Sequence, residues 1–315
     1  MQYNRRKNPN SKGGISGVFL DTTILNMLDY HYETFLTVCK TLNYTRAAEA
    51  LNMSQPAVSN HIAFLEQRMG TKLFYHKNKK VYLTNEGTFL FNKIQFMLNY
   101  STKTLDELHS LDYTKINLGC TLSISDYIIP SFFVQMFHDQ KEFRLDVMVE
   151  NTQILLDYLA QGKIDAAFIE GDFNQDVFSS FPFAQSTIVG VCSPEFELAD
   201  QEVKFEDLFD YQLITRELGS GTLSSLENIL QKEQIDITSF KHQTKLGSID
   251  LIKRVVEKNI GISFLFDVCV EEELARGSLK QLHFKEPFDP KNMNFVYLSD
   301  NPTTDFILKM KEKFQ

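Results

Sequence analysis

Residues 44–66 read YTRAAEALNMSQPAVSNHIAFLE, and this stretch contains two short helical patterns that meet at a polar break. Residues 45–51 form the first pattern, because their apolar positions recur at helical spacing. Its apolar stripe consists of Ala47, Ala48 and Leu51. Residues 52–53 form the turn that follows, so this part of the chain predicts two helices joined by a tight connection.

The second helical pattern begins after Ser54, whose hydroxyl suits an N-cap, and Pro56 lies near the first turn, where a missing N–H costs little. Its inward stripe has spacings of three and four residues and consists of Ala57, Val58, Ile62 and Leu65. The polar side chains left facing out are Gln55, Ser59, Asn60 and His61. Such groups can hydrogen-bond base edges in a major groove. The stretch therefore predicts a helix-turn-helix whose second helix is the recognition helix, and the alternative is an ordinary helical hairpin with a polar solvent face.

The surrounding sequence favours the first interpretation. Residues 47–74 read AAEALNMSQPAVSNHIAFLEQRMGTKLF, and residues 83–87 read LTNEG. This long and specific order resembles the N-terminal domain of LysR-type transcriptional regulators, and the resemblance covers about residues 27–310. It implies a winged helix-turn-helix, a long linker helix and a two-lobed, periplasmic-binding-protein-like α/β effector domain.

The resemblance also implies partners. We expect double-stranded DNA, a small anionic or zwitterionic effector and a homodimer or homotetramer, with RNA polymerase as a further candidate. We expect no catalytic residue, cofactor, bound metal or membrane association, and a cytoplasmic location. The parts of the chain are then a disordered extension at 1–26, the winged helix-turn-helix at 27–85, the linker helix at 86–112, and the effector domain at 113–315, with lobe I at about 113–186 and 282–315 and lobe II at about 187–281.

The charge distribution agrees with a nucleic-acid partner, although the formal net charge of the 315-residue chain is −9. Residues 1–86 contain 11 lysines and arginines against 6 aspartates and glutamates, a charge of +5, so the remainder carries −14. A basic head before an acidic body suggests a nucleic-acid module on a separate domain. The hydrophobic content of 43% suits a globular protein with two or three domains.

Four cysteines lie far apart in the sequence, without a CxxC pair: Cys39, Cys120, Cys192 and Cys269. This spacing argues against a structural zinc site or a disulfide framework and fits a reducing compartment. A redox switch between two of them is the alternative. No apolar run reaches the length of about 18 residues that a membrane span needs.

The N-terminal residues 1–26 are polar, Gly-rich and basic, and they lack the pattern of a secretory signal. We interpret them as a disordered extension, a cloning remnant or an early start, with a basic DNA-contacting arm as the alternative. Residues 29–42 have apolar positions at helical spacing and should form the first helix. Gly70 should end the recognition helix as a C-cap.

A β-hairpin wing is predicted after the recognition helix, with strands at 72–75 and 80–84 around the segment 76–79. Lysines near its tip suit DNA phosphates, although a solvated charged turn is the alternative. Two positions depart from the family, which commonly has Arg where Asn60 and His76 stand; Asn60 brings no charge, and His76 would make a pH-dependent contact. The candidate DNA-binding residues are Thr45, Arg46, Ser54, Gln55, Pro56, Ser59, Asn60, His61, Lys77, Lys79 and Lys80.

A long helix is predicted at residues 86–111, about 25 residues or roughly 38 Å in length. Its apolar stripe has a spacing near that of a coiled coil and consists of Leu90, Ile94, Met97, Leu105 and Leu108. In the family this helix joins two heads, and we expect the same here.

From residue 115 strands alternate with helices, which predicts parallel α/β sheets. In the first run the strands are 116–120, 144–150 and 164–169, and the helices are 125–138 and 152–161. In the second run the strands are 187–192, 211–215, 242–246 and 261–266, with helices starting near Thr222 and Ser248. The chain should then return through a strand at 294–298 and a helix at 303–314.

Ligands of open α/β sheets bind beyond the carboxyl ends of the strands. Three loops there carry hydroxyls and glycines and lead into helices, whose N-terminal N–H groups favour anions. In the family, the loops matching 121–123 and 220–222 face the ligand, and Glu170 matches a position that lines the pocket. The expected effector-binding residues are Thr121, Leu122, Ser123, Glu170, Arg216, Gly219, Ser220, Gly221, Thr222, Gly247 and Ser248. The alternative for each loop is a simple helix cap.

Other classes of protein are less well supported by the sequence. The segment GSGT at 219–222 lacks the Gly-Lys-Ser/Thr ending of a phosphate-binding loop, and neither a GxSxG nor an HExxH motif is found. An enzyme or a solute-binding protein built on the two lobes is therefore the alternative to a regulator. The charge of Glu170 would disfavour a dianion unless Arg216 or a ligand ammonium balances it, which hints at an amino-acid-like effector.

Overall fold

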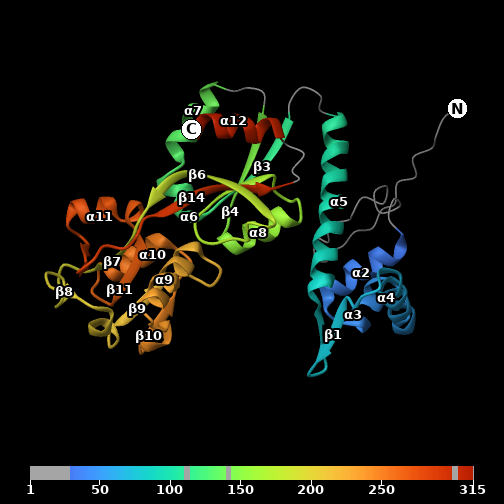
Figure 1. Cartoon of the computed structure of the whole chain (residues 1–315), viewed down its shortest axis with the longest axis horizontal. Helices are drawn as coiled ribbons and strands as arrows, with labels where there is room; N and C mark the ends of the chain where they lie inside the picture. The colour runs from blue at the N-terminus through green and yellow to red at the C-terminus, as the bar shows by residue number, and fades with distance from the viewer. Residues whose placement is uncertain (1–28, 110–113, 140–142, 300–303, 315) are drawn as a thin grey trace, which may run out of the picture. The chain divides into compact units, whose positions relative to one another are not determined.

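The computed structural model describes residues 29–109, 114–139, 143–299 and 304–314. The extension expected at 1–26 lies outside the described residues. The chain divides into two compact units, residues 1–91 and 92–315, which are described in turn (Figure 1). None of the described helices is both long and apolar enough to cross a membrane.

The first unit is a winged helix-turn-helix head. Its helices are α2 (Tyr30–Thr41), α3 (Tyr44–Ala50) and α4 (Gln55–Met69), and its hairpin strands are β1 (Phe74–Lys77) and β2 (Lys80–Leu83). Each helix begins at a side-chain N-cap, supplied by Asp29, Asn43 and Ser54. Gly70 ends α4 in the left-handed conformation, as predicted. The core of the head contains Phe35, Val38, Val58 and Leu65, which are fully buried.

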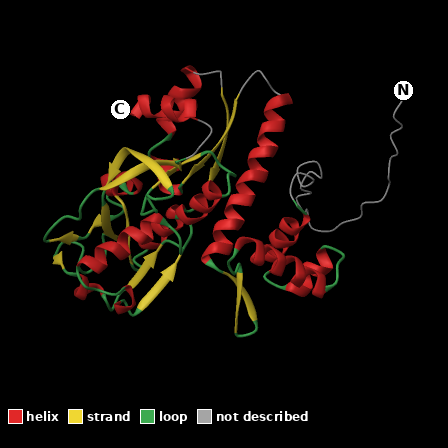
Figure 2. Cartoon of the chain, turned by 45° about the vertical axis from the view of Figure 1, so that its right-hand side comes forward, coloured by secondary structure: helices red, strands yellow, loops and turns green. Residues whose placement is uncertain are grey.

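The hairpin of the head is tighter than the sequence predicted (Figure 2). Phe74 pairs with Leu83, and Lys77 pairs with Lys80, so only Asn78 and Lys79 form the turn. The φ angles of these two residues are +52° and +60°, as in the two-residue turns that match the twist of paired strands. The expected turn at 76–79 was therefore wrong, because His76 and Lys77 belong to β1.

The helix α5 (Asn85–His109) continues from the head into the second unit. Its predicted apolar stripe does not lie on one exposed face, because Ile94 is only 4% exposed and Met97 is 55% exposed. In the second unit, the Asn99 side-chain amide donates to the Gln161 carbonyl over 2.8 Å. Met97, Leu105 and Leu108 of the predicted stripe are exposed, and α5 also exposes Phe89 and Tyr100.

The second unit is built on two five-stranded sheets. The first has the order β4-β3-β5-β14-β6, with β3 (Thr114–Cys120), β4 (Phe143–Val149), β5 (Ala166–Ile169), β6 (Phe178–Ser186) and β14 (Lys291–Leu298). The second has the order β10-β9-β11-β7-β12, with β7 (Ile188–Cys192), β9 (Gln212–Thr215), β10 (His242–Lys245), β11 (Ile262–Phe266) and β12 (Lys280–Gln281). A short parallel pair is formed by β8 (Glu202–Val203) and β13 (His283–Phe284).

Helices flank these sheets in the same unit (Figure 1). With the first sheet are α6 (Leu122–Tyr127), α7 (Pro130–Asp139), α8 (Thr152–Ala160) and α12 (Thr304–Phe314). With the second are α9 (Gly221–Lys232), α10 (Ile249–Val256) and α11 (Glu271–Arg276), together with the 3-10 turns η1 (Phe205–Leu208), η2 (Ile237–Ser239) and η3 (Asp267–Cys269). The single helix expected at 125–138 is two helices, since the residue before Pro130 is disfavoured from the α conformation.

The sheets are mixed rather than purely parallel. Strand β14 runs antiparallel to both β5 and β6, and β11 runs antiparallel to β7. The expectation of parallel strands holds for β3 with β4 and β5 and for β9 with β10 and β11. It was wrong for the strands at β14, because β6 and β14 carry the chain from one lobe to the other and back. The sequence also missed β6, whose Pro182 has no N–H to donate; an edge strand tolerates this loss.

Gly87, at the start of α5, packs closely against Leu73 and Leu83 of the head. A Cβ atom on Gly87 would lie 2.1 Å from the Leu73 carbonyl oxygen and 2.9 Å from Leu83 Cδ2. We expect Gly87→Ala to lower the free energy of unfolding by about 1–3 kcal/mol, because overpacking forces the backbone to shift. Denaturant unfolding would measure this, with the exposed neighbour replaced in Glu86→Ala as the control. Equal effects of the two substitutions would contradict the close approach.

Candidate functional site

The recognition helix α4 buries the predicted stripe except for Ala57, which is half-buried, and it leaves a polar face. Val58, Ile62 and Leu65 are at most 2% exposed. The Ser54 hydroxyl accepts a hydrogen bond from the Ala57 amide over 3.3 Å, which caps the helix as predicted. Of the outward residues, Gln55 is exposed and donates from its amide to the Ser59 hydroxyl over 2.8 Å. Ser54, Pro56 and Asn60 are also exposed.

A groove of about 550 Å³ lies between α4 and the hairpin. Gln55 and Ser59 line it from α4, Tyr44 lines it from α3, and His76 and Lys79 line it from the hairpin. The rings of Tyr44 and His76 stack with centroids 6.0 Å apart. The structure therefore brings two of the predicted base-reading residues together with the wing.

The structure places His61 differently from Gln55 and Ser59. Its Nδ1 atom lies 2.8 Å from the Thr34 hydroxyl, and its ring contacts the rings of Tyr30 and His31 on α2. Burial lowers the pKa of His61, and the nearby His31 adds to the shift, whereas Asp29 opposes it. Because these contacts lie against α2, His61 is not among the residues that line the groove.

The other predicted contacts of the head are exposed. Thr45 and Arg46 have exposed side chains, while both backbone N–H groups donate to the Asn43 side chain over 2.9 and 3.1 Å. Lys77, Lys79 and Lys80 surround the turn of the hairpin and are exposed, so their ammonium groups can meet a polyanion. Asn43 caps α3 and was not predicted to do so, although Asn before a helical pattern is a known signal.

The effector-binding residues predicted in the α/β unit differ in how deeply they are buried. Those that are at most 4% exposed are Thr121, Ser123, Glu170, Arg216, Ser220 and Thr222, and Gly221 is also buried. Leu122 is half-buried, and those that are exposed are Gly219, Gly247 and Ser248. The Ser248 hydroxyl accepts from the Leu251 amide over 3.3 Å, so at this loop the helix cap accounts for the hydroxyl.

The buried group joins the two lobes at Glu170. The hydroxyls of Thr121 and Ser123 both donate to the Glu170 carboxylate, the second over 3.3 Å. Ser123 Oγ in turn lies 3.5 Å from Thr222 Oγ1 at the start of α9. Burial raises the pKa of Glu170, and the two hydroxyls and the charge of Arg216 oppose this shift.

Three donors beside this cluster have no partner in the described part of the chain. They are Thr215 Oγ1, Arg216 Nη1 and Ser220 Oγ. Arg216 Nε and Nη2 donate to the Glu217 carboxylate over 2.9 and 3.0 Å. Ser220 is the N-cap residue of the 12-residue helix α9 but makes no side-chain cap bond. Buried donors without acceptors are costly, so this arrangement suits an anion. Thr215 was missed because nothing in a buried strand marks its last hydroxyl as unpaired.

The four cysteines are buried free thiols. Burial raises the pKa of every one, to about 11 for Cys192 and to about 12 for Cys269. The thiolate is the reactive form, so these environments count against a redox switch. Among the described residues, no group of three or more His, Cys, Asp or Glu side chains could hold a metal ion.

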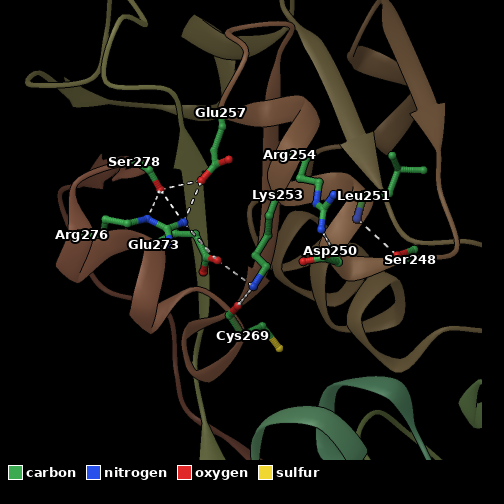
Figure 3. Close-up of polar contacts among 10 residues, drawn as sticks. All are labelled: Ser248, Asp250, Leu251, Lys253, Arg254, Glu257, Cys269, Glu273, Arg276 and Ser278. Atoms are coloured by element: carbon green, nitrogen blue, oxygen red, sulfur yellow. Dashed lines mark hydrogen bonds and ion pairs between the residues drawn. The ribbon is translucent and has the colours of Figure 1, made fainter.

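A second polar cluster, which the sequence did not predict, surrounds Lys253 and Glu273 (Figure 3). Lys253 Nζ on α10 lies 3.0 Å from Glu273 Oε1 and donates to the Cys269 carbonyl over 3.1 Å. It also lies 4.9 Å from the ring centroid of Tyr127, on the other lobe. Burial opposes the shift, but hydrogen bonds with Tyr127 and Glu273 raise the pKa of Lys253. This cluster connects α6 to lobe II.

Comparisons with known proteins identify two family models in this chain. Residues 30–88 match the family described as bacterial regulatory helix-turn-helix protein, lysR family, and residues 111–310 match the LysR substrate binding domain. The chain is 26% identical over 291 residues to the HTH-type transcriptional regulator CysL of Bacillus subtilis, covering 90% of this chain and 96% of that protein. It is 28% identical over 250 residues to the HTH-type transcriptional regulator YeiE of Escherichia coli K12, covering 79% and 84%.

A solved structure extends the comparison to three dimensions. The regulatory domain of CcmR from Synechocystis PCC6803, solved in complex with 2-PG, superposes with a TM-score of 0.56 at 20% sequence identity. It covers 64% of this chain and 97% of that domain. At this level of identity the likeness shows a common fold.

The buried pair of Lys253 and Glu273 gives a prediction about stability. Their side chains are 7% and 10% exposed. We expect Lys253→Met to lower the free energy of unfolding by about 3 kcal/mol, the low end of the range for a broken buried pair, because Glu273 then keeps only the exposed Arg276, 3.7 Å away, as a cation. Denaturant unfolding followed by circular dichroism would measure this. The double variant Lys253→Met with Glu273→Gln should recover most of the loss; no recovery would mean that the lysine stem, not the charge, is what matters.

Proposed function

The chain belongs to the LysR family of helix-turn-helix transcriptional regulators, and we propose that it reads DNA with its head and responds to a small anionic effector held between the lobes of its α/β unit. The observation that carries this proposal is the pairing of two features in one chain. One is the groove between α4 and the hairpin, and the other is the set of unpartnered buried donors beside Glu170.

In the head, we assign base reading to Gln55, Ser59 and Asn60. Gln55 and Ser59 lie within one turn of each other, and amide and hydroxyl groups of this kind can hydrogen-bond base edges. Ser54 and Pro56 begin the helix and so fix its N-terminus beside the duplex. The residues assigned to the phosphate backbone are Thr45, Arg46, Lys77, Lys79 and Lys80, which are all exposed. We give His61 a supporting role, because it packs against α2.

In the α/β unit, we assign the effector to the buried group around Arg216 and the start of α9. The donors there come from one lobe, and Thr121, Ser123 and Glu170 come from the other. A ligand that contacts both lobes can bias their arrangement, as regulation requires. The CcmR regulatory domain was solved with 2-PG, which supports the assignment of a small-ligand role to this fold. The loop at Gly247 and Ser248 lies at the exposed rim in this proposal.

We also propose a homodimer formed through α5, with homotetramers built by further contacts of the α/β units. Phe89, Met97, Tyr100 and Leu108 fall within about 100° of the helix circumference at the usual 100° per residue. All four side chains are at least 44% exposed. A one-sided apolar face on a 25-residue helix suits a helical partner.

RNA polymerase is a further candidate partner, and the proposed role needs neither catalysis nor a cofactor. It also implies a cytoplasmic location, where the DNA is.

The proposed base contact can be tested in the head. Gln55→Ala should weaken binding to the cognate site by about 1–3 kcal/mol and relax specificity, because a base-edge contact is lost. Lys77→Ala should weaken binding to all sequences alike and reduce the salt slope by about one unit. Fluorescence anisotropy with DNA from upstream of the gene, at several salt concentrations, would measure both. Gln67→Ala, at an exposed position in the other half of α4, is the control, and uniform weakening by Gln55→Ala would rule out base reading.

The proposed dimer can be tested on α5. Met97→Asp should place a charge in the apolar seam and shift the protein toward monomers in light scattering. Leu308→Asp on α12 is the matched control, because Leu308 is 52% exposed and Met97 is 55% exposed. If the molar mass falls equally or not at all in the two variants, α5 is not the dimer helix.

A further inference from the structure

Glu170 is a buried carboxylate. It is 1% exposed, and no ion pair between described residues includes it. The charge of Arg216 acts on the Glu170 carboxylate, but the Arg216 guanidinium forms two hydrogen bonds with Glu217. The Arg216–Glu217 pair is therefore neutral as a unit. An ionised Glu170 would leave this buried site with a net negative charge.

The free polar groups beside Glu170 select an anion. Arg216 Nη1 can only donate, and the hydroxyls of Thr215 and Ser220 are unpartnered and buried. The first turn of α9 adds backbone N–H groups at the positive end of a helix. A ligand ammonium near Glu170 would instead share the carboxylate with the hydroxyls of Thr121 and Ser123 and would leave Arg216 Nη1 without an acceptor.

The anion-binding groups and Glu170 belong to one site. A Cβ atom on Gly221 would lie 2.7 Å from Glu170 Cγ, so the start of α9 packs directly on the glutamate. Thr222 Oγ1 reaches Ser123 Oγ, which itself donates to Glu170. An anion at the start of α9 and a charge on Glu170 would thus be close neighbours in a low-dielectric environment, where like charges repel strongly.

We propose that the effector is a small oxyanion that binds together with one proton, and that Glu170 carries this proton. This inference rests on the anion site proposed above and names the class of ligand and the specificity residue. The proton comes from solvent and forms a bond to a carboxylate oxygen of Glu170. The protonated side chain can donate to one of its two hydroxyl partners and accept from the other. Binding of the anion then adds no second negative charge to the site.

The other titratable groups around Glu170 do not provide this proton. Those whose charge acts on Glu170, or on which Glu170 acts, are Arg216, Cys120 and Cys269. Burial raises the pKa of Cys120 and Cys269, so both thiols keep their protons through neutral pH. Farther along these contacts, Asp126 acts on Cys120 and Lys253 acts on Cys269. Burial also raises the pKa of Glu170, which favours its protonated form.

The direction of the pH dependence follows from this linkage. Below the pKa of Glu170 in the free protein, the site is already protonated and the anion binds most tightly. Above it, each bound anion must take up a proton, so the dissociation constant rises by about tenfold per pH unit until the pKa of the complex is reached. A ligand whose ammonium met Glu170 would show the opposite dependence, because it would need the ionised carboxylate.

The test uses the full-length protein and inorganic sulfate, which does not titrate between pH 5.5 and 8.5. Isothermal titration calorimetry at constant ionic strength should give weaker sulfate binding as the pH rises. Glu170→Gln should bind sulfate with an affinity that no longer changes with pH, because the amide is neutral throughout. Circular dichroism would verify that this variant is folded. Glu233→Gln is the matched control, since it removes an exposed charge at the other end of α9 and should keep both the affinity and its pH dependence.

The outcomes separate this inference from the proposed function. Sulfate binding that is independent of pH, or a pH dependence that persists in Glu170→Gln, would overturn the role of Glu170 while leaving the anion site intact. Glycine as the probe tests the zwitterion: tighter glycine binding at high pH would overturn the proton-linked oxyanion. If sulfate binds neither to the wild type at any pH nor to the Thr215→Val and Ser220→Ala variants, both proposals are overturned together.

Discussion

The arrangement of the α/β unit depends on a backbone contact between its two lobes. A Cβ atom on Gly221 would lie 2.3 Å from the Glu170 carbonyl oxygen, and one on Gly171 would lie 2.9 Å from the Gly221 Cα atom. Only glycine lets the first turn of α9 reach the end of β5 this closely, and Gly171 also has a φ of +90°. This contact excludes water from the surroundings of Glu170. The polar groups nearby must therefore find partners in the protein or in a ligand.

Much of this organisation could be predicted from the sequence, because it rests on local signals. Ser54 and Gly70 cap α4 as their residue types require, and the apolar spacing of Val58, Ile62 and Leu65 identifies the buried face. Membership of the LysR family was also predicted correctly from the motif at 47–74. The buried state of most expected effector residues agrees with loops that follow strand ends, although their individual roles stay predictions.

What the sequence could not give depends on partners that are distant along the chain. His61 has the spacing of an outward residue, but Thr34 and the rings of α2 occupy its side chain. Ile94 has the spacing of a coiled-coil seam, yet it is buried within the chain. The unpaired state of Thr215 is likewise invisible, since it depends on which neighbours fail to reach the hydroxyl. Periodicity identifies a face but not what covers it.

The strands β3 and β5 connect the proposed effector site to α5 within the α/β unit. At one end they lead to Thr121 and Glu170, which hydrogen-bond to each other. Near the other end, Asp165 accepts from the Asn117 amide over 2.8 Å and pairs with Lys103 of α5 over 2.7 Å. Because packed strands move as rigid bodies rather than bending freely, a ligand that shifts one lobe against the other acts on the same strands that hold α5. The ion pair between Lys103 and Asp165 is 15% and 13% exposed, so this connection is partly shielded from solvent and salt.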